Sequence, residues 1–274
     1  MAATIPAAFF WPPPGNYLST VDTTPVPMRH GLDPGTLNGY GDMVLGFVYA
    51  YLPPPPVSTA VTLSAAAATT EDGEGIDRIS GLPDDLLRRI LSRLPAKDGA
   101  RTAALSTRWR GLWRSAPLVL VDAHLLPTAS VGISRSHLPF RFGADPRGLA
   151  DAVSTVLAAH PGPFRCVYLL GTPMETHRDE IALWLQRLST KAVQELIFVN
   201  RAMTLDNEAH LPATLFRCTS LTKIYIGFWR LPETATLKGA AGFPYLQELG
   251  LFSLIMKDED LIFVLNRCPV LVNS

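Results

Sequence analysis

The stretch IDRISGLPDDLLRRILSRLPAKDGARTAALSTRWRGLW, residues 76–113, decides how the chain is organised. Its first half predicts an amphipathic helix, because leucine and isoleucine recur every four residues along one side. Pro83 suits the first helical turn, where its missing N–H is harmless, and Asp84 and Asp85 follow at the positive end of the helix dipole. Pro95 is expected to end this helix.

Two further short helices are expected in the second half of the stretch. One runs from Asp98, a favourable N-cap, through Leu105. The next starts at Ser106 and carries Trp109 and Trp113 on one side. Three helices within about forty residues cannot bury all of these apolar side chains among themselves. Part of this surface should therefore contact a partner.

These residues closely resemble the plant form of the F-box motif. That motif has Leu-Pro at its start, a Leu/Ile helix, an Arg-Thr pair, Leu-Ser, and a tryptophan followed by Leu-Trp. The matching residues here are Leu82, Pro83, Leu86, Ile90, Leu91, Leu94, Pro95, Arg101, Thr102, Leu105, Ser106, Trp109, Leu112 and Trp113. One departure is Gly99-Ala100, where a larger aliphatic residue is usual, and the glycine should loosen the second helix. A three-helix piece of a larger core is the alternative interpretation.

A repeated pattern follows the helical stretch. Leu118–Val121 predicts a short strand, and the apolar spacing from Leu149 to Leu157 predicts a helix that ends before Pro161. Four segments then share the order apolar-x-x-apolar-x-apolar, and they are FRCVYL at 164–169, VQELIF at 193–198, LTKIYI at 221–226 and LQELGL at 246–251. Their spacing matches the period of leucine-rich repeats, in which each unit supplies a strand with one buried face. Helical spacing between them, as at Ile181–Leu188 and Leu261–Cys268, completes the units.

The last segment, Leu271–Ser274, is expected to begin a fifth strand and then stop. The repeat domain is therefore expected to be incomplete at its C-terminus, with poorly ordered final residues, because a solenoid core normally needs a polar terminal cap. Cys218 and Cys268 each lie three residues before a repeat start, which predicts a repeated packing position rather than chemistry. Asp258 is expected to cap the helix that precedes this end.

Residues 1–75 predict a disordered extension rich in proline and alanine. Two apolar clusters, 9–11 and 43–52, stand out in it, and either they dock on the folded part or they stay unstructured; the second interpretation is preferred. The N-terminus lacks the basic region of a signal peptide, and the apolar runs are too short for a membrane span. The expected location is the cytoplasm, the nucleus or both.

Charge and chemistry-bearing residues narrow the function. Residues 76–117 carry nine basic and four acidic residues, which raises the possibility of a DNA-binding module, although acids interleave with the bases and favour a solvated or protein-contacting face. The three cysteines and six histidines show no metal-ligand spacing, and no catalytic or phosphate-binding motif is present. An enzyme, a cofactor, a nucleic-acid partner and a membrane partner are therefore not expected.

The expected fold is α/β, with an F-box at 76–117 and a short leucine-rich-repeat solenoid at 118–274 behind the disordered extension. The resemblance implies a substrate-recognition subunit of an SCF-type (cullin-RING) ubiquitin ligase. Its F-box would bind a Skp-type adaptor, and through it a cullin, while the repeats hold an unknown target. The expected adaptor-binding residues are Leu82, Pro83, Leu86, Ile90, Leu91, Leu94, Pro95, Leu105 and Trp109. A non-ligase interaction scaffold or truncated decoy receptor is the alternative.

Overall fold

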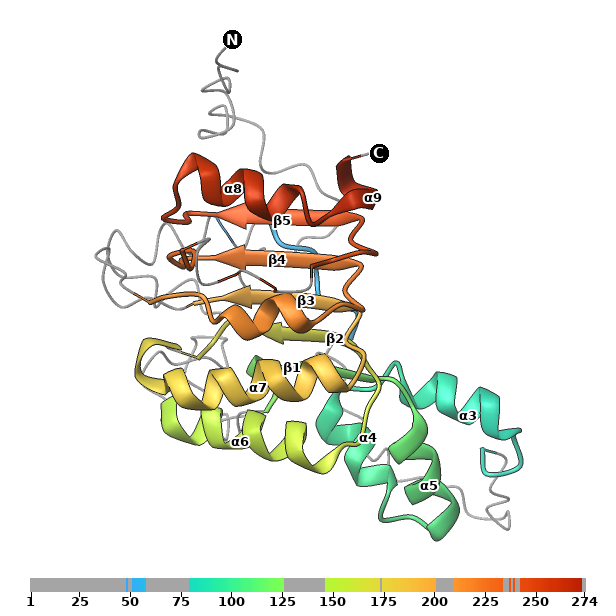
Figure 1. The fold of residues 1–274 in the computed structure, drawn as a ribbon. Helices are drawn as coiled ribbons and strands as arrows, with labels where there is room; N and C mark the ends of the chain where they lie inside the picture. Colours follow the sequence, from blue (N-terminus) through green and yellow to red (C-terminus); the bar gives the residue numbers. More distant parts are fainter. Residues whose placement is uncertain are drawn as a thin grey trace, which may run out of the picture.

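A computed structural model describes residues 48, 51–57, 79–125, 146–172, 174–200, 209–233, 237, 239 and 242–272. Three short helices come first, and together they form what we name the three-helix unit (Figure 1). They are α3 (Asp84–Leu91), α4 (Ala96–Thr102) and α5 (Thr107–Ser115). Leu87, Leu91, Trp109, Leu112 and Ala116 make its buried core. The unit thus has a small core of its own, which buries some of its apolar side chains but not all of them.

The second part is a parallel sheet of five strands in the order β1-β2-β3-β4-β5. The strands are β1 (Leu118–Val121), β2 (Phe164–Leu169), β3 (Glu195–Val199), β4 (Lys223–Gly227) and β5 (Glu248–Phe252). Neighbours in the sequence are neighbours in the sheet, so each connection leads to the next strand along. This is the leucine-rich-repeat-like arrangement that the recurring segments predict. The strand at 118–121, which precedes the repeated segments in the sequence, joins the same sheet as its first strand.

A layer of helices covers one face of the sheet. It contains α6 (Pro146–Ala159), α7 (Arg178–Thr190), α8 (Asp258–Leu265) and the short turns η4 (Met174–His177) and η5 (Ala213–Arg217), and Figure 1 shows α6, α7 and α8 on this side. A further turn, η3 (Asp122–His124), directly follows β1. The repeated apolar positions stand side by side, since Leu196 pairs with Ile224 and Ile224 with Leu249. Their side chains form one core with Ile181, Trp184, Leu185 and Leu188 of α7.

The structure differs from the sequence-based expectations at several element ends. Helix α4 ends at Thr102 rather than at Leu105, and α8 ends at Leu265 rather than at Cys268. Helix α4 begins at Ala96, not at Asp98, because Pro95 takes the N-cap position and opens the second helix. At α8 the N-cap is Lys257 rather than Asp258, and the carboxylate of Asp260 accepts the Lys257 backbone N–H at 3.2 Å. Finally, the expected fifth strand is wrong where it is described, since Pro269–Val272 form the short helix α9. Residues 273 and 274 lie outside the described residues.

Burial of the strands also departs from the expected one-sided pattern. All four residues of β1 and the last four of both β2 and β3 are buried, whereas those of β5 are all half-buried. The face of β1–β3 that is turned away from α7 packs against Val48, Leu52 and Val57 of the N-terminal region. The preferred interpretation of 43–52 as unstructured therefore fails at Val48 and Leu52, and the rest of the expected extension lies outside the described residues.

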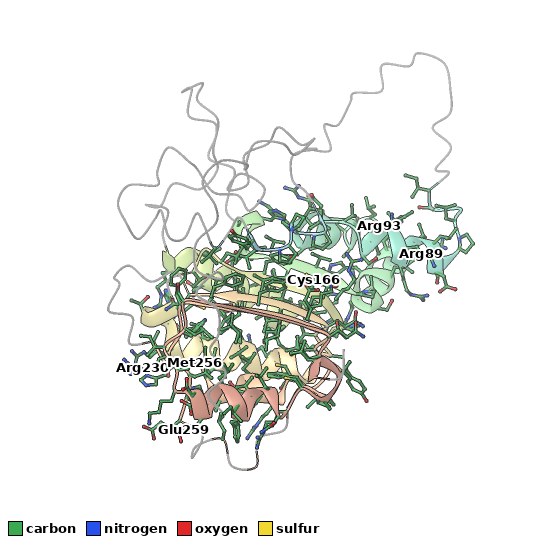
Figure 2. All side chains as sticks on the ribbon, turned by 90° about the horizontal axis from the view of Figure 1, so that it is seen from above. Arg89, Arg93, Cys166, Arg230, Met256 and Glu259 are labelled. Atoms are coloured by element: carbon green, nitrogen blue, oxygen red, sulfur yellow. The ribbon has the colours of Figure 1, made fainter. Side chains whose placement is uncertain are left out.

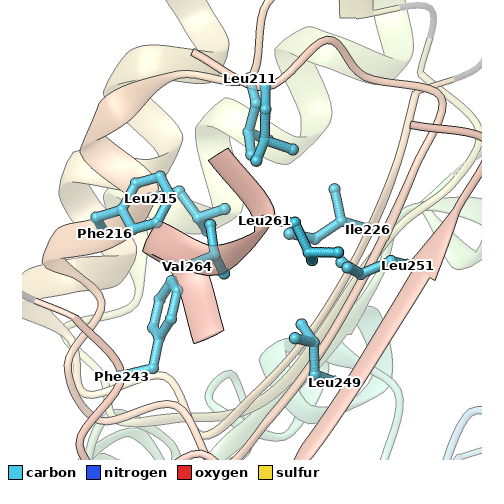
Figure 3. A pocket seen from close by; sticks show the side chains of 10 residues that line it. Leu211, Leu215, Phe216, Ile226, Phe243, Leu249, Leu251, Leu261 and Val264 are labelled. Atoms are coloured by element: carbon cyan, nitrogen blue, oxygen red, sulfur yellow. The ribbon is translucent and has the colours of Figure 1, made fainter. Parts of the chain in front are cut away.

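An apolar pocket lies between η5, strands β4 and β5, and α8 (Figure 3). Its lining is wholly apolar: Leu211, Leu215, Phe216, Ile226, Leu231, Phe243, Leu249, Leu251, Leu261 and Val264. Without a polar side chain it offers nothing to orient a small ligand, so it belongs to the core of the β4–β5 end. Within the described residues, no helix has the length and apolar character needed to cross a membrane. The domain boundaries at residues 75 and 117 stay a prediction.

Candidate functional site

Helix α3 carries apolar side chains on two sides, one buried and one exposed. Leu87 and Leu91 point into the core of the three-helix unit and are at most 2% exposed. Leu86 and Ile90, one residue earlier in each case, are 44% and 41% exposed. Residues four positions apart lie on the same face of a helix, so Leu86 and Ile90 form one outward row. We name this pair the outward row of α3.

The other expected adaptor-binding residues fall into three environments. Pro83 and Leu105 are exposed, and Leu105 lies between α4 and α5 with 68% of its surface accessible. Leu82 and Leu94 are half-buried and pack on the core of the unit, in which Leu91 and Trp109 lie. Pro95 is buried and pairs with Val119 of β1. Four of the nine expected residues are exposed and accessible to a partner: Pro83, Leu86, Ile90 and Leu105. The other five are buried or half-buried and pack within the fold: Leu82, Leu91, Leu94, Pro95 and Trp109.

Arg108 fixes the start of α3 against α5. Its Nε and Nη2 both donate to Oδ1 of Asp84, at 3.0 and 2.7 Å, and Nη2 also donates to the carbonyl of Leu82 at 2.7 Å. The indole N–H of Trp109 donates to Oγ of Ser80 at 3.1 Å. A charge-assisted contact of this kind orders the Leu82-Pro83 turn before the helix begins. Neither role is visible in the sequence pattern, since each contact joins residues more than twenty positions apart.

Charges frame the outward row. Asp84 and Asp85 lie in the first turn of α3, and Arg88 pairs with Asp85 at 2.6 Å and donates to Oγ of Ser115 at 3.1 Å. Arg89 and Arg93 are exposed (Figure 2). An apolar row beside exposed guanidinium groups is suited to a protein surface with an apolar centre and an acidic rim.

The three-helix unit is joined to the sheet by a buried histidine. His160 is fully buried, and its ring meets that of Trp113 edge-on, with centroids 4.9 Å apart. Its Nδ1 accepts the Gly162 N–H at 3.0 Å, so Nε2 carries the proton and donates to the Trp113 carbonyl at 2.9 Å. Burial lowers the pKa of His160, which keeps the ring neutral. With the Pro95–Val119 pairing, this contact fixes the position of the unit at the β1 end of the sheet.

Buried polar groups follow two of the strands at their carboxyl ends. After β1, the Asp122 carboxylate accepts the N–H groups of Leu170 and Gly171 at 2.9 and 2.8 Å and of Ala123 at 2.7 Å. Its complete burial raises its pKa to about 6, and these N–H donors oppose that rise. After β3, Oδ1 of Asn200 accepts the Met174 N–H at 3.0 Å. Each side chain thus links the segment after its own strand to the segment after β2.

The remaining chemistry-bearing residues have structural roles in the part of the chain that the structure describes. Cys218 and Cys268 are both buried, Cys218 directly after η5 and Cys268 three residues after α8, which agrees with the packing role that their spacing predicts. Burial raises the pKa of Cys218 to about 12. Thiols of this kind stay protonated and unreactive. No group of three or more histidine, cysteine or acidic residues within the described ranges could hold a metal ion.

Comparison with known proteins agrees with this division of the chain. A model of the F-box domain matches residues 79–120. A model described as the leucine-rich repeats of the FBD-associated F-box protein At5g56370 matches residues 181–273. The first match contains α3–α5 and all but the last residue of β1, and the second begins within α7 and includes β3–β5, α8 and α9.

Curated relatives come from Arabidopsis thaliana. The F-box/FBD/LRR-repeat protein At1g13570 is 30% identical over 200 residues, which are 73% of this chain and 44% of the relative. The F-box/LRR-repeat protein At3g26922 is 28% identical over 209 residues, 74% of this chain and 60% of the relative. The chain thus spans about half the length of these relatives, and no solved structure matches it. On these matches, the protein belongs to the plant F-box/leucine-rich-repeat proteins.

Proposed function

We propose that this protein is a substrate-recognition subunit of an SCF-type (cullin-RING) ubiquitin ligase. The three-helix unit binds a Skp-type adaptor and, through it, a cullin, and the repeat sheet holds a target protein. The observation that carries the proposal is the outward row of α3. Leu86 and Ile90 remain 44% and 41% exposed although the unit has closed its own core beneath them. Apolar side chains in such a position usually dominate the affinity of an interface.

The junction with the sheet supports the same proposal. A receptor of this kind carries out no covalent step, and it acts by holding its target near the ubiquitin-carrying partner. Such positioning requires a fixed relation between the two binding parts. The His160 hydrogen bonds to Trp113 and Gly162 and the Pro95–Val119 pairing supply it. The proposed location is the cytoplasm or the nucleus, where adaptor and target would be met.

The test is capture of a purified Skp-type adaptor by the full chain. We expect the double substitution Leu86→Asp with Ile90→Asp to weaken capture by about 100-fold or more, because two central apolar contacts are lost and two charges are desolvated. The matched control is Leu183→Asp, which changes a leucine that is 50% exposed on α7, away from the three-helix unit. Circular dichroism should show the same folded content in both variants.

Unchanged adaptor capture by the double variant would refute the adaptor-binding role. The pair Leu82→Ala with Pro83→Ala addresses the same idea less cleanly, because Leu82 also packs on the core of the unit. Ubiquitination of a captured target in a reconstituted reaction would separate the receptor from a non-ligase scaffold, which would capture the adaptor but support no transfer.

A further inference from the structure

The face of the sheet away from α7 carries an apolar patch on its first three strands. Val121 pairs with Tyr168 and Tyr168 with Ile197, so the three side chains stand in one row across β1–β3. They are only 2%, 1% and 1% exposed. We name this surface the second face of β1–β3. Left uncovered, it would be an apolar patch of the kind that soluble proteins seldom expose.

A proline-rich segment of the same chain covers this face. Leu52 and Val57 are each 5% exposed and belong to the same buried cluster as the row of Tyr168. Between them runs Pro53–Pro56, and Figure 1 shows the segment in blue behind the strands, on the side away from α7. Pro54 and Pro56 are exposed while Pro53 and Pro55 are half-buried. The segment is therefore held at both ends by aliphatic side chains, with prolines alternately facing the sheet and the solvent.

One hydroxyl of the sheet bonds to the backbone of the proline run. Tyr168 donates its O–H toward the carbonyls of Pro53 and Pro54, each at 3.2 Å. Proline has no N–H, so a proline run presents only carbonyl acceptors, and a surface that recognises it must supply donors and flat apolar contacts. A tyrosine that offers both is the usual choice in proteins that bind proline-rich peptides. Burial raises the pKa of Tyr168, which keeps the hydroxyl in its donating form.

We propose that the second face of β1–β3 is a binding site for an extended proline-rich peptide with aliphatic residues at both ends, and that residues 52–57 of the same chain occupy it. A partner protein with the same chemistry then binds by displacing this segment. The segment is suited to exchange because, in the described residues, it makes no strand pairing with the sheet. This inference names the ligand class of the repeat sheet, and it rests on the proposed function of that sheet as the target-holding part.

The first test measures binding of a fluorescein-labelled synthetic peptide with the sequence VYAYLPPPPV, residues 48–57, to the full chain. Leu52→Asp with Val57→Asp should free the face, because both buried aliphatic contacts become charged. We expect this variant to bind the peptide at least ten-fold more tightly than the unchanged chain, whose site is already filled. The control, Tyr51→Asp with Pro56→Asp, alters two exposed residues of the same segment and should behave like the unchanged chain.

The role of the hydroxyl is tested in the freed variant. Adding Tyr168→Phe should weaken peptide binding several-fold, whereas Tyr225→Phe should leave it unchanged, because the Tyr225 hydroxyl donates to Glu248 and not to the segment. Equal peptide affinity in the freed and unchanged chains would overturn the proposal, and so would an unaltered affinity after Tyr168→Phe. Adaptor capture is measured on the same samples, so a failed peptide site with intact capture refutes this inference and leaves the adaptor role standing.

A second measurement does not depend on the folding of any sheet variant. A protease site inserted in the alanine run 65–68 lets the tether be cut while the segment and the sheet keep their own sequences. We expect the cut N-terminal piece to stay bound at high protein concentration, to dissociate on dilution, and to be released by excess peptide 48–57. The same peptide with aspartate at the positions of Leu52 and Val57 should not release it. A piece that no peptide releases, or that separates at every concentration, would contradict the proposal.

Discussion

The outward row of α3 and the second face of β1–β3 are both apolar surfaces that lie outside the main core. Ile90 on the first is 41% exposed, and Ile197 on the second is 1% exposed. Both residues sit in regular elements whose opposite side is already packed against the rest of the fold. The difference is a cover supplied from elsewhere in the chain. Whether an apolar position is available to a partner therefore depends on long-range packing, and the local pattern alone does not decide it.

The largest expected effect separates buried from exposed apolar residues within the three-helix unit. Trp109→Ala should lower the free energy of unfolding by about 3–5 kcal/mol, because it empties the core and removes the indole donor to Ser80. Leu105→Ala should change it by less than about 0.5 kcal/mol, since this side chain is 68% exposed. Urea unfolding followed by circular dichroism measures both values.

The same pair tests the role of the exposed residue. Leu105→Ala should reduce adaptor capture while the fold is retained. Hydrogen exchange over 84–115 shows whether a loss of stability in the tryptophan variant is confined to the three-helix unit. Equal losses of stability in the two variants would mean that the unit does not have the closed core described for it.

Much of the fold follows from local patterns. Pro83 and the two following aspartates predict the start of α3, and the apolar-x-x-apolar-x-apolar segments predict the four strands β2–β5. Such signals succeed because the helix and strand periods depend on residues that are close in the sequence. The start of α4 was wrong by two residues because proline both ends one helix and opens the next.

The candidate site could be predicted only in part. The row of leucine and isoleucine on α3 is visible, but its division into Leu87 and Leu91 inside and Leu86 and Ile90 outside depends on where α5 packs. Arg108 and His160 act through contacts between distant residues, for which the sequence has no period. A usable signal did exist for the covered face, since Val119, Cys166 and Ile197 make the strands apolar on both sides.

A second prediction concerns the sheet, where the Asp122 carboxylate holds three N–H groups. Asp122→Ala should lower the free energy of unfolding by about 2–4 kcal/mol at pH 7, because the donors of Ala123, Leu170 and Gly171 lose their acceptor in a buried site. Asp151→Ala, which removes an exposed carboxylate from α6, should leave stability within about 0.5 kcal/mol of the unchanged protein. Chemical unfolding at fixed salt measures both variants.

The pH dependence of this difference identifies the buried carboxylate. The pKa of Asp122 is raised from 3.8 to about 6, so the folded state holds the proton more tightly than the unfolded chain. The extra stability that this tighter proton binding adds, beyond that of the hydrogen bonds present at pH 7, is fully present below pH 3.8 and is lost as the pH rises through about 6. The advantage of the unchanged protein over Asp122→Ala should therefore grow by on the order of 1 kcal/mol between pH 7 and pH 5. An advantage that shrinks over this range would contradict the burial of a charged carboxylate.

The smallest expected effect comes from replacing a glycine by alanine, once in the three-helix unit and once in the sheet. Gly99 lies in α4, and a Cβ added there would stand 3.6 Å from Cδ1 of Trp113, which is ordinary van der Waals contact. Gly99→Ala should therefore stabilise the protein by about 0.5–1 kcal/mol, because alanine favours the helix more than glycine does. Thermal unfolding followed by circular dichroism detects a change of this size as a shift of a few degrees.

Gly250→Ala is the matched change in β5. There the added Cβ would stand 2.2 Å from Cδ1 of Tyr225, whose ring lies across the glycine and stacks on Phe252 with centroids 6.1 Å apart. Moving the ring should cost about 1–3 kcal/mol, the usual range for overpacking. Opposite signs are thus expected for one added methyl group. If Gly99→Ala were also destabilising, the departure from the F-box pattern at this position would be needed for packing against Trp113, and a larger aliphatic residue there would weaken the unit further.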